Sequence, residues 1–572
     1  MKGGNKLQIT GGKILIKCLL EQGVDTVFGF PGGTVLNIYD ELYHHKTKIK
    51  HILTSHEQGA AHAADGYARS TGKVGVCIAT SGPGATNLVT GIATAYMDSV
   101  PLIAITGNVP VSLLGKDSFQ EIDIMGVTMP ITKHNFIVKD VKDLAATIRK
   151  AFYLAQEGRP GPVLIDIPKD ITIKKADYKA QKPKKITKMT EYITDKDIEK
   201  TLQMIETSQK PLIYAGGGII WGEAEKELAQ FVQTIQSPVC CSLMGISGFP
   251  ADDPLYIGMV GMHGTKTASL ATTHCDLMIV LGARFSDRVV GKLEQFAPGA
   301  KILHVDIDAA EINKNVQTHH HIIGDVKEVL KKINHKLKKQ THKKWLEQIK
   351  GWKTKYPLVY KKDKKLKPQY IIEKVYELTK NKAIVTTEVG QHQMWAAQYY
   401  SWNKARTFIS SGGLGTMGFG LGAAIGTQVG NPKKRVLNIA GDGSFRMNCH
   451  ELATAVEYEL PVIIVLINNS ALGMVRQWQN LFYDSRFSHT HLDHKTDFCK
   501  LAEAYGAVGL KLDKTEDVEK VIKKALALKR PVVIDCKIER EENVYPMVPP
   551  GKALQDIIIA NEECDTGFQP GD

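Results

Sequence analysis

A chain of 572 residues is too long for one hydrophobic core, and at roughly 100–200 residues per domain it implies about three domains. Its 43% hydrophobic and 23% charged residues are typical of a globular protein, which excludes a disordered or fibrous chain. The net charge of +13 could suit nucleic acid, but much of the excess lies in the lysine-rich stretch 331–367. Because that stretch lacks interleaved arginines, we interpret it as solvated surface and expect no nucleic-acid partner.

The cysteines and the apolar runs give no sign of a secreted or membrane protein. The nine cysteines are irregularly spaced and include no C-x-x-C pair, so neither a disulfide framework nor a zinc site is indicated. The N-terminus lacks the features of a signal peptide, and no apolar run approaches the roughly 20 residues that span a bilayer. We therefore expect a cytoplasmic protein with reduced thiols and no membrane partner.

Short β-rich apolar runs alternate with helical patterns along nearly the whole chain. This alternation predicts βαβ units, and hence parallel sheets covered by helices on both faces. The predicted strands are 26–30, 73–80, 101–106, 162–168, 211–216, 276–282, 301–308, 383–390, 435–443, 461–469 and 531–538.

Two polar, lysine-rich breaks, at 174–197 and about 331–367, divide this series. We therefore predict an α/β fold of three doubly wound parallel-sheet domains. Their predicted extents are residues 1–175, 195–330 and 365–545, followed by a tail at 546–572.

The third domain contains two strand ends that point to a metal and a phosphate. One predicted strand ends in the sequence GDG around Asp442, and the next ends, one βαβ crossover later, in Asn468-Asn469. Ligands of open sheets bind beyond the carboxyl ends of the strands, so Asp442 and Asn469 should face one crevice. A carboxylate and an amide oxygen beside a glycine turn suit Mg²⁺ that also binds a phosphate. The ordinary alternative for GDG alone, an aspartate that caps a helix, explains the second strand end less well.

This pair of strand ends resembles the diphosphate-anchoring motif of the thiamine diphosphate enzymes. The resemblance implies that Mg²⁺ is bound by Asp442, Asn469 and the main-chain oxygen of Ala471. It also implies that EVGQHQMWAAQ (388–398) contacts the diphosphate and that a methionine in SGGLGTMGFGLGAAIG (411–426) props the cofactor in a folded shape. The implied cofactor contacts are Gly390, Gln391, His392, Met417, Gly441, Gly443, Ser444 and Met474.

Glu57 is the candidate catalytic acid of the first domain. It follows the strand-like segment 51–55 and precedes a helix of small residues, where desolvation would raise the pKa of a carboxyl group. A helix-capping glutamate is the ordinary alternative. The segment is similar to the pyrimidine-binding domain of the same family, whose glutamate protonates the cofactor's aminopyrimidine and so activates the cofactor. In that family the glutamate and the diphosphate anchor come from different subunits, which implies a homodimer or a dimer of dimers.

Within the family the chain resembles the catalytic large subunits of the acetohydroxyacid (acetolactate) synthases over essentially its whole length. The stretch 115–133 would place Phe119 and Gln120 beside the reacting carbon, and 158–170 would place Lys169 near the substrate entrance. The tail VYPMVPPGKAL (544–554) matches a segment that closes over the site. GMHGT (261–265) and GARFSDR (282–288) match a flavin site in the middle domain. The implied FAD contacts are Arg159, Gly216, Gly217, Gly218, His263, Gly264, Thr265, Gly282, Arg284, Asp306 and Asp325.

Two further residues would bind the substrates. Arg288 could bind a 2-ketoacid carboxylate in a planar, bidentate manner. Trp478 could form an apolar wall that accepts one extra methylene, worth roughly 1–3 kcal/mol in favour of 2-ketobutyrate over pyruvate. A surface ion pair and a core tryptophan are the ordinary alternatives. The resemblance implies decarboxylation of pyruvate and transfer of its two-carbon unit to a second 2-ketoacid. The product would be 2-acetolactate or 2-aceto-2-hydroxybutyrate, on the path to valine, leucine and isoleucine.

The resemblance also implies the cofactors and a protein partner. The cofactors would be thiamine diphosphate, Mg²⁺ and a structural, non-redox FAD, and a separate regulatory small subunit would bind the chain. Glu388 and Arg446 depart from the family pattern, and their roles are left open. The nearest alternative functions are other thiamine diphosphate enzymes. Among them, a pyruvate oxidase would reduce its flavin when given pyruvate.

Overall fold

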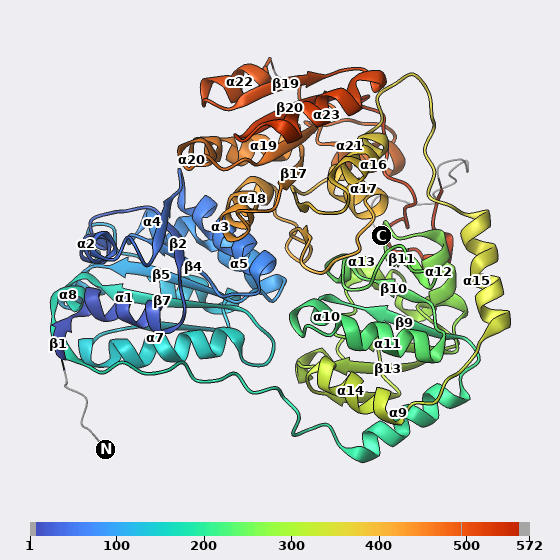
Figure 1. The fold of residues 1–572 in the computed structure, drawn as a ribbon, viewed down its shortest axis with the longest axis horizontal. Coiled ribbons are helices and arrows are strands. Elements are labelled where there is room, and N and C mark those ends of the chain that lie inside the picture. Colours follow the sequence, from blue (N-terminus) through green and yellow to red (C-terminus); the bar gives the residue numbers. More distant parts are fainter. Residues whose placement is uncertain (1–6, 494, 560–572) are drawn as a thin grey trace.

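The computed structural model describes residues 7–493 and 495–559, which form three six-stranded sheets and one two-stranded ribbon. The three sheets follow one another along the chain and lie in three bodies (Figure 1): an N-terminal domain in blue, a central domain in green and a C-terminal domain in orange and red. The prediction of three doubly wound parallel-sheet domains is confirmed. The residue boundaries of the domains stay predictions.

The N-terminal sheet has the strand order β3-β2-β4-β5-β7-β6, and all its pairs are parallel. Strand β4 is buried along its whole length, as expected where helices cover both faces of a sheet. The strands are β2 (Thr26–Gly29), β3 (Lys50–Leu53), β4 (Gly75–Ala79), β5 (Leu102–Asn108), β6 (His134–Ile137) and β7 (Pro162–Pro168), and β1 (Leu7–Thr10) pairs with β8 (Lys175–Tyr178) in the ribbon. The helices are α1 (Gly11–Glu21), α2 (Leu36–His44), α3 (Glu57–Thr71), α4 (Pro83–Asn87), α5 (Val89–Met97), α6 (Ile124–Thr128), α7 (Val141–Gln156) and α8 (Lys169–Ile173).

The central sheet has the order β11-β10-β9-β12-β13-β14, again all parallel. Its strands are β9 (Pro211–Ala215), β10 (Val239–Cys241), β11 (Tyr256–Met259), β12 (Leu277–Leu281), β13 (Lys301–Asp306) and β14 (His320–Ile323). Its helices are α9 (Asp195–Thr207), α10 (Gly217–Trp221), α11 (Glu225–Ile235), α12 (Lys266–His274), α13 (Asp287–Val290), α14 (Val326–Lys336) and α15 (Lys343–Lys355).

The C-terminal sheet has the order β16-β15-β17-β18-β20-β19 and is parallel as well. Its strands are β15 (Ile384–Thr387), β16 (Phe408–Ile409), β17 (Val436–Gly441), β18 (Ile463–Asn468), β19 (Val508–Leu512) and β20 (Val532–Lys537). Its helices are α16 (Pro368–Thr379), α17 (Gln391–Tyr399), α18 (Phe419–Gly430), α19 (Asp442–Asn448), α20 (Leu452–Glu457), α21 (Gly473–Phe482), α22 (Phe498–Ala504) and α23 (Val518–Ala527).

The lysine-rich stretch 331–367 is more ordered than a plain break between domains. It contains helix α15, which buries Trp345 and Ile349 in the core of the central domain. The lysines of α15, such as Lys344 and Lys350, are exposed on its other face. The interpretation as solvated surface therefore holds for the lysine side chains, while the backbone beneath them belongs to the central domain.

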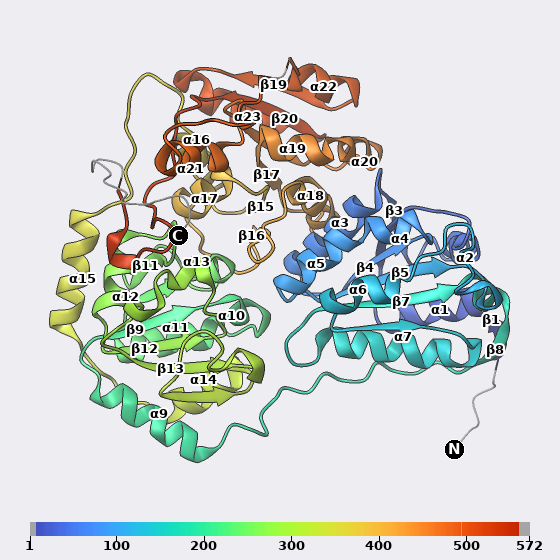
Figure 2. The same cartoon turned by 180° about the vertical axis from the view of Figure 1, so that it is seen from behind.

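The N-terminal and C-terminal domains share one hydrophobic cluster, in which α3 packs against α18 (Figure 2). The two helices approach so closely because small residues line the contact. A Cβ atom on Gly426 would lie 1.7 Å from the carbonyl oxygen of Ala63, and one on Gly66 would lie 2.2 Å from that of Ala423. This contact holds helix α3, whose first residue is Glu57, against the C-terminal domain.

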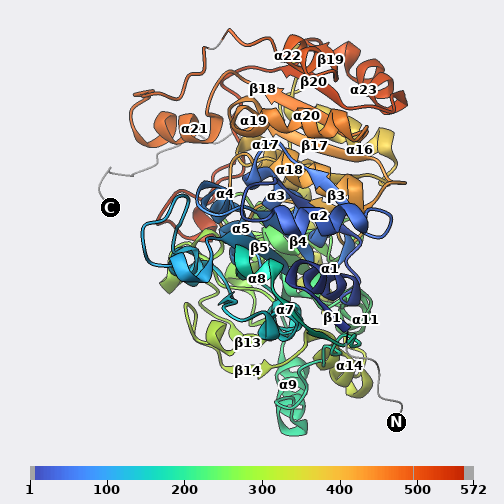
Figure 3. The ribbon, with the colours of Figure 1, turned by 90° about the vertical axis from the view of Figure 1, so that its left-hand side faces the viewer.

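None of the helices in the described ranges combines the length and apolarity that a bilayer crossing requires. In Figure 3, α21 lies at the outer side of the C-terminal domain, apart from the sheet. It leaves Val475 53% exposed. A helix in this position, with an exposed apolar side chain, is available to border a binding site.

Candidate active site

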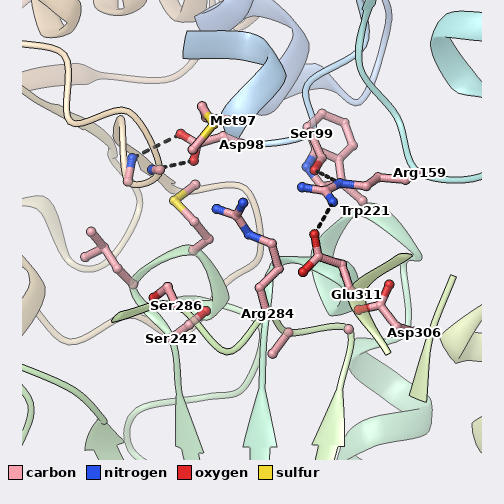
Figure 4. Close-up of a pocket in the computed structure, with 18 of the residues that line it drawn as sticks. Met97, Asp98, Ser99, Arg159, Trp221, Ser242, Arg284, Ser286, Asp306 and Glu311 are labelled. Carbon is pink, nitrogen blue, oxygen red and sulfur yellow. Dashed lines mark hydrogen bonds and ion pairs between the residues drawn. The ribbon is translucent and has the colours of Figure 1, made fainter. Parts of the chain in front are cut away.

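A cavity of about 1000 Å³ lies where the three domains meet (Figure 4). It is bounded by the carboxyl ends of strands in the central sheet, by a loop of the C-terminal domain and by the end of α5. The predicted site residues that line it are Arg159, Gly217, Gly218, His263, Gly282, Arg284, Arg288, Asp306, Asp325, Gly390, Met474 and Trp478. The sequence therefore identified residues from all three domains that come together at one place.

Glycines create the floor of the cavity at the ends of β9 and β12. A Cβ atom on Gly218 would lie 2.7 Å from the Cα of Gly282, and Gly282 has a left-handed backbone with φ of +55°. Only glycine fits this approach of two loops without strain. The neighbouring Gly216 supports the same packing but does not line the cavity.

Arg284 extends from the end of β12 into the middle of the cavity (Figure 4). Asp306, at the end of β13, and Glu311 lie on the same side of it. A guanidinium group that reaches into a cavity can bind a phosphate, because its planar donors match phosphate oxygens.

Arg159 holds two domains together at the cavity wall. Its Nη1 lies 3.0 Å from Asp308 and 2.9 Å from Glu311 of the central domain, and its Nε donates to Ser99 Oγ at 2.8 Å. Burial lowers the pKa of Arg159, but the two carboxylates outweigh burial and raise it above its usual value. The predicted flavin contact lines the cavity and is paired with two carboxylates.

The polar segment 174–197, predicted as a break, also contributes to the cavity. Residues 186–189 line it, Lys188 Nζ lies 2.8 Å from Asp325 Oδ2, and the amide of Asp325 donates to the carbonyl of Met189 at 2.9 Å. These residues were not predicted from the sequence. The signal available was the apolar pair Ile186 and Met189 among lysines.

The GMHGT turn places two residues, Met262 and His263, in the cavity, and two others build the turn. His263 lines the cavity, and burial lowers its pKa to about 4, so the ring is neutral. Gly264 leaves no room for a side chain, because a Cβ there would lie 2.4 Å from the carbonyl of Met259. Thr265 caps α12 and donates to Ile257 O at 2.6 Å, so its hydroxyl serves the fold.

The tail packs over this turn and the neighbouring loop of the central domain. The amide of Val548 donates to Met262 O at 2.7 Å, and Lys292 N donates to Lys552 O at 3.1 Å. Leu554 and Ile557 are buried in the core of the central domain. The part of the tail after residue 559 lies outside the described residues.

Arg288 and Trp478, the predicted substrate residues, meet across two domains. The guanidinium carbon lies 5.9 Å from the centroid of the tryptophan ring, and both residues line the cavity. Arg288 is 63% exposed and its nearest carboxylate is Asp287, at 3.3 Å. Trp478 is only partly buried, so it is not a core tryptophan. The pair presents a cation and an apolar ring face to the same space.

The strand-end residues of the C-terminal domain converge as predicted from parallel strands. Gly441, just before Asp442, is the register partner of Ile467 on β18, so Asp442 and Asn469 follow neighbouring strand ends. Both residues are buried. Asn469 Nδ2 donates to Gln391 Oε1 at 3.1 Å, and Asn469 Oδ1 accepts from the amide of Ala471 at 3.1 Å. Three loops, after β15, β17 and β18, therefore meet at one edge of the sheet.

Glycines allow these loops to pack closely against the side chains of His392 and Gln391. A Cβ on Gly441 would lie 2.6 Å from Nδ1 of His392, and one on Gly473 would lie 2.0 Å from Oε1 of Gln391. The Nε2 atom of His392 is buried and has no hydrogen-bond partner among the described residues. Gly443 packs beside Leu472. The arrangement can accept an anion among glycine loops and a buried, unsatisfied imidazole.

Glu388 and Ser444 form hydrogen bonds that hold this edge of the sheet together. Ser444 Oγ donates to Glu388 Oε2 at 2.9 Å and accepts from the amide of Gly418 at 3.0 Å. Glu388 also accepts from the amide of Leu421 at 3.0 Å, and its burial raises its pKa. The carboxylate therefore ties α18 to α19. Arg446, the other departure from the family pattern, is exposed on the outside of α19.

The predicted residues of the N-terminal domain form a separate group. Glu57 begins α3, is 8% exposed and accepts from Asn87 Nδ2 at 2.9 Å. Gln120 packs against the loop at Gly82, where a Cβ would lie 2.8 Å from its carbonyl oxygen, and Phe119 is 87% exposed. These residues are not among those lining the cavity. Lys169, which begins α8, and Met417, in the glycine loop before α18, also lie outside its lining.

The sequence matches family models along three stretches, one in each of the three domains. They are described as the N-terminal TPP binding domain, the central domain and the C-terminal TPP binding domain of thiamine pyrophosphate enzymes, and they match residues 9–127, 198–333 and 388–536. A relative from Cyanidium caldarium, named acetolactate synthase large subunit, is 46% identical over 98% of this chain and 99% of its own. The chain belongs to the acetolactate synthase large subunits, within the thiamine pyrophosphate enzymes.

Relatives from other organisms give the same result. The acetolactate synthase large subunit of Haemophilus influenzae is 44% identical over 98% of this chain and all of its own. A probable acetolactate synthase large subunit of Methanocaldococcus jannaschii is 47% identical over 96% of this chain and 95% of its own. The family resemblance seen in the motifs is therefore confirmed over nearly the whole chain.

Proposed function

We propose that this thiamine pyrophosphate enzyme condenses pyruvate with a second 2-ketoacid. The product is 2-acetolactate when the acceptor is pyruvate and 2-aceto-2-hydroxybutyrate when it is 2-ketobutyrate. The observation that carries the proposal is the convergence of Gln391, Asp442 and Asn469 at neighbouring strand ends, adjoining a large cavity through Gly390. The extent of the match to relatives named acetolactate synthase large subunit supports the same reaction.

Thiamine diphosphate, when bound, supplies the electron sink for decarboxylation and carbon–carbon bond formation. We propose that Asp442, Asn469 and the carbonyl of Ala471 hold Mg²⁺, because hard oxygen ligands suit this ion. The unsatisfied Nε2 of His392, whose ring has room beside Gly441 because that residue lacks a side chain, supports a diphosphate at the same place. Burial lowers the pKa of His392 to about 3, so its neutral ring can donate one hydrogen bond to an anionic oxygen.

We propose FAD as a structural occupant of the cavity. A volume of about 1000 Å³ is at the upper end of the usual range for cofactor sites. Arg284 would bind the flavin diphosphate, and Asp306 would accept from a ribose hydroxyl, as acidic residues at strand ends do in dinucleotide folds. The condensation has no net redox step, so the flavin needs no change of oxidation state.

Arg288 and Trp478 would select the second substrate. Arg288 is exposed enough to bind a ketoacid carboxylate, and Trp478, 5.9 Å away, would contact the alkyl end. An extra methylene against an apolar wall is worth roughly 1–3 kcal/mol, so we expect 2-ketobutyrate to compete well against pyruvate. Lys169 would lie near the entrance that the substrates use.

Glu57 would exchange a proton with the pyrimidine ring of a cofactor bound by a partner subunit. This is supported by the position of Glu57 outside the cavity lining and by the exposed apolar surface of its domain, where Phe119 is 87% and Met129 66% exposed. We therefore propose a homodimer or a dimer of dimers, in which Gln120 lies at the shared site. The name of the relatives, large subunit, supports a separate regulatory small subunit as a further partner.

The direct test is to incubate the purified chain with pyruvate, thiamine diphosphate, Mg²⁺ and FAD and to measure acetolactate. We expect product that depends on each cofactor and a flavin that stays oxidised during turnover. Flavin reduction at the catalytic rate would instead favour a pyruvate oxidase. An absence of acetolactate, with pyruvate and cofactors saturating, would overturn the proposal.

A further inference from the structure

The segment that leads into Glu57 is held by the C-terminal domain of the same chain. The amide of Leu53 donates to Tyr458 Oη at 2.8 Å, and Ser55 Oγ donates to His450 O at 3.1 Å. These bonds join residues about four hundred positions apart in the sequence. The position of α3, which begins with Glu57, is therefore set by groups outside its own domain.

Among the hydrogen bonds between the two domains, Glu451 makes the two that lie closest in sequence to Glu57. Its Oε2 accepts from the amide of Ser55 at 3.2 Å, and its Oε1 accepts from the amide of His56 at 3.1 Å. His56 is the N-cap of α3 and Glu57 is its first residue. One carboxylate thus binds two successive amides immediately before the proposed proton donor.

The surroundings of Glu451 are built for a carboxylate. The residue has no exposed surface, and Thr454 Oγ1 donates to Oε2 at 2.6 Å. Gly59 provides the room, because a Cβ there would lie 2.0 Å from Oε1 of Glu451. Burial of a charged group without partners is costly, and three donors in a closed space offset that cost here. Burial raises the pKa of Glu451, and its hydrogen bonds oppose the rise.

Glu451 ends the 3₁₀ turn Cys449–Glu451, which continues helix α19. Helix α19 begins with Asp442, the proposed Mg²⁺ ligand. The same short helical segment therefore starts at the diphosphate edge of the C-terminal sheet and ends at the amides before Glu57. A carboxylate on this segment can fix the start of α3 in two directions, since its two oxygens bind two different amides.

We infer that Glu451 is a positioning residue, which holds the start of α3 so that Glu57 meets the pyrimidine ring of the partner subunit's cofactor in the correct place. The inference rests on the proposed function of Glu57. Glu451 itself touches neither substrate nor cofactor in this role. A displacement of about 1 Å at such a group can cost on the order of 100-fold in rate, so the two hydrogen bonds have a large expected effect.

The test compares Glu451→Gln and Glu451→Ala in the full-length chain. Glutamine keeps one acceptor oxygen for one of the two amides, and alanine keeps none. We expect the exchange of the cofactor's C2 proton with deuterium, which Glu57 promotes, to slow by about 10-fold in the first variant and about 100-fold in the second. The amides of residues 53–56 should lose protection from hydrogen exchange in the same order, with cofactor absent. The KM for pyruvate and the Kd for thiamine diphosphate should stay within about twofold of the original values, because the binding residues are intact.

Asp166→Asn serves as the matched control. Asp166 is another fully buried carboxylate, and it accepts from Thr106 and Asn108 in the N-terminal domain. This variant should lower stability without slowing C2 proton exchange. Unchanged amide protection in both Glu451 variants would overturn the inference, and so would lost protection with C2 proton exchange at the original rate. If the unaltered chain protected these amides but did not exchange the C2 proton of the cofactor, the proposed role of Glu57 would be wrong. The proposed positioning role of Glu451 in catalysis would then be wrong as well.

Discussion

Replacing Arg69 with methionine is expected to destabilise the junction between the N-terminal and C-terminal domains. Arg69 lies on α3 and is almost fully buried. Its guanidinium contacts Asp65 at 2.5 Å and Asp98 at 3.0 Å, and it donates to Ser410 O at 2.9 Å. Asp98 in turn accepts from the amides of Gly412 and Gly413, which line the cavity (Figure 4).

The expected loss follows from what the substitution leaves behind. The side chains of Asp65 and Asp98 are both 0% exposed, so without Arg69 two buried carboxylates lose their counter-ion. Removing one partner of a buried pair costs about 3–5 kcal/mol. The control is Lys73→Met, which breaks an ion pair whose side chains are 53% and 51% exposed. Exposed pairs contribute about 0.2–1 kcal/mol. The loss in free energy of unfolding should therefore be several-fold larger for Arg69→Met than for Lys73→Met.

The loss should also depend on pH in a defined direction. Burial raises the pKa of Asp65, and the guanidinium of Arg69 opposes that rise. Without Arg69, the pKa of Asp65 in the folded state should rise further above its value in the unfolded chain. The folded variant then binds a proton more tightly than the unfolded chain, so it gains relative stability as pH falls and loses it as pH rises. The deficit of Arg69→Met should therefore be larger at pH 8 than at pH 6.

Urea titration followed by hydrogen exchange in α3 measures this junction directly, since a chain with three domains does not unfold in one step. Arg69→Met and Lys73→Met would be compared with the original chain at both pH values. Equal losses for the two variants would refute the assignment of Arg69 as a buried structural cation. If the stability lost in Arg69→Met were the same at pH 6 and pH 8, the loss could not come from a buried carboxylate with a raised pKa.

Three further substitutions test the proposed site. Glu57→Gln should lower acetolactate formation by about 10²–10⁴-fold while the calorimetric Kd for thiamine diphosphate stays nearly unchanged; full activity would contradict a role in proton transfer. Asp442→Ala should weaken Mg²⁺-dependent binding of thiamine diphosphate by at least about 10-fold, whereas Arg446→Ala, an exposed change on the same helix, should not; equal binding in both would remove Asp442 from the metal site. Trp478→Leu should lower the ratio of 2-aceto-2-hydroxybutyrate to acetolactate by about 10-fold or more when both acceptors compete, and an unchanged ratio would count against an apolar wall.

The strands that were predicted from the sequence are mostly the central ones of each sheet. β4, β12 and β18 are buried along their full length and are nearly continuous apolar runs. The strands that were missed are mainly at or next to the edges, where partners and helices cover less of the strand. β6, HNFI, and β14, HHII, are edge strands with polar residues, so their patterns do not stand out from loops.

The candidate site was predictable where it depends on local patterns. Strand ends in a parallel sheet meet at one edge, so the convergence of Asp442 and Asn469 follows from βαβ spacing alone. The partners of Arg159 were not predictable in this way. Asp308 and Glu311 lie in another domain, about 150 positions along the chain, and the contact depends on how the two domains pack. The cavity lining at 186–189 was hidden for the same reason, because its role arises only where the chain packs beside the residues that follow β14.

Buried carboxylates at the domain junctions explain how three domains can hold the groups of one site in fixed positions. The packing of α3 on α18 joins two domains through small apolar residues, but apolar burial has no direction and tolerates sliding. Glu451, Asp98 and Glu311 each bind specific amides or a guanidinium from another domain, and each lies next to a group with a proposed role. A hydrogen bond depends steeply on distance and angle, so such contacts fix positions that packing leaves free. Burying these charges costs free energy. The buried carboxylates are kept despite that cost because the chemistry needs Glu57 and the cavity loop in one defined place.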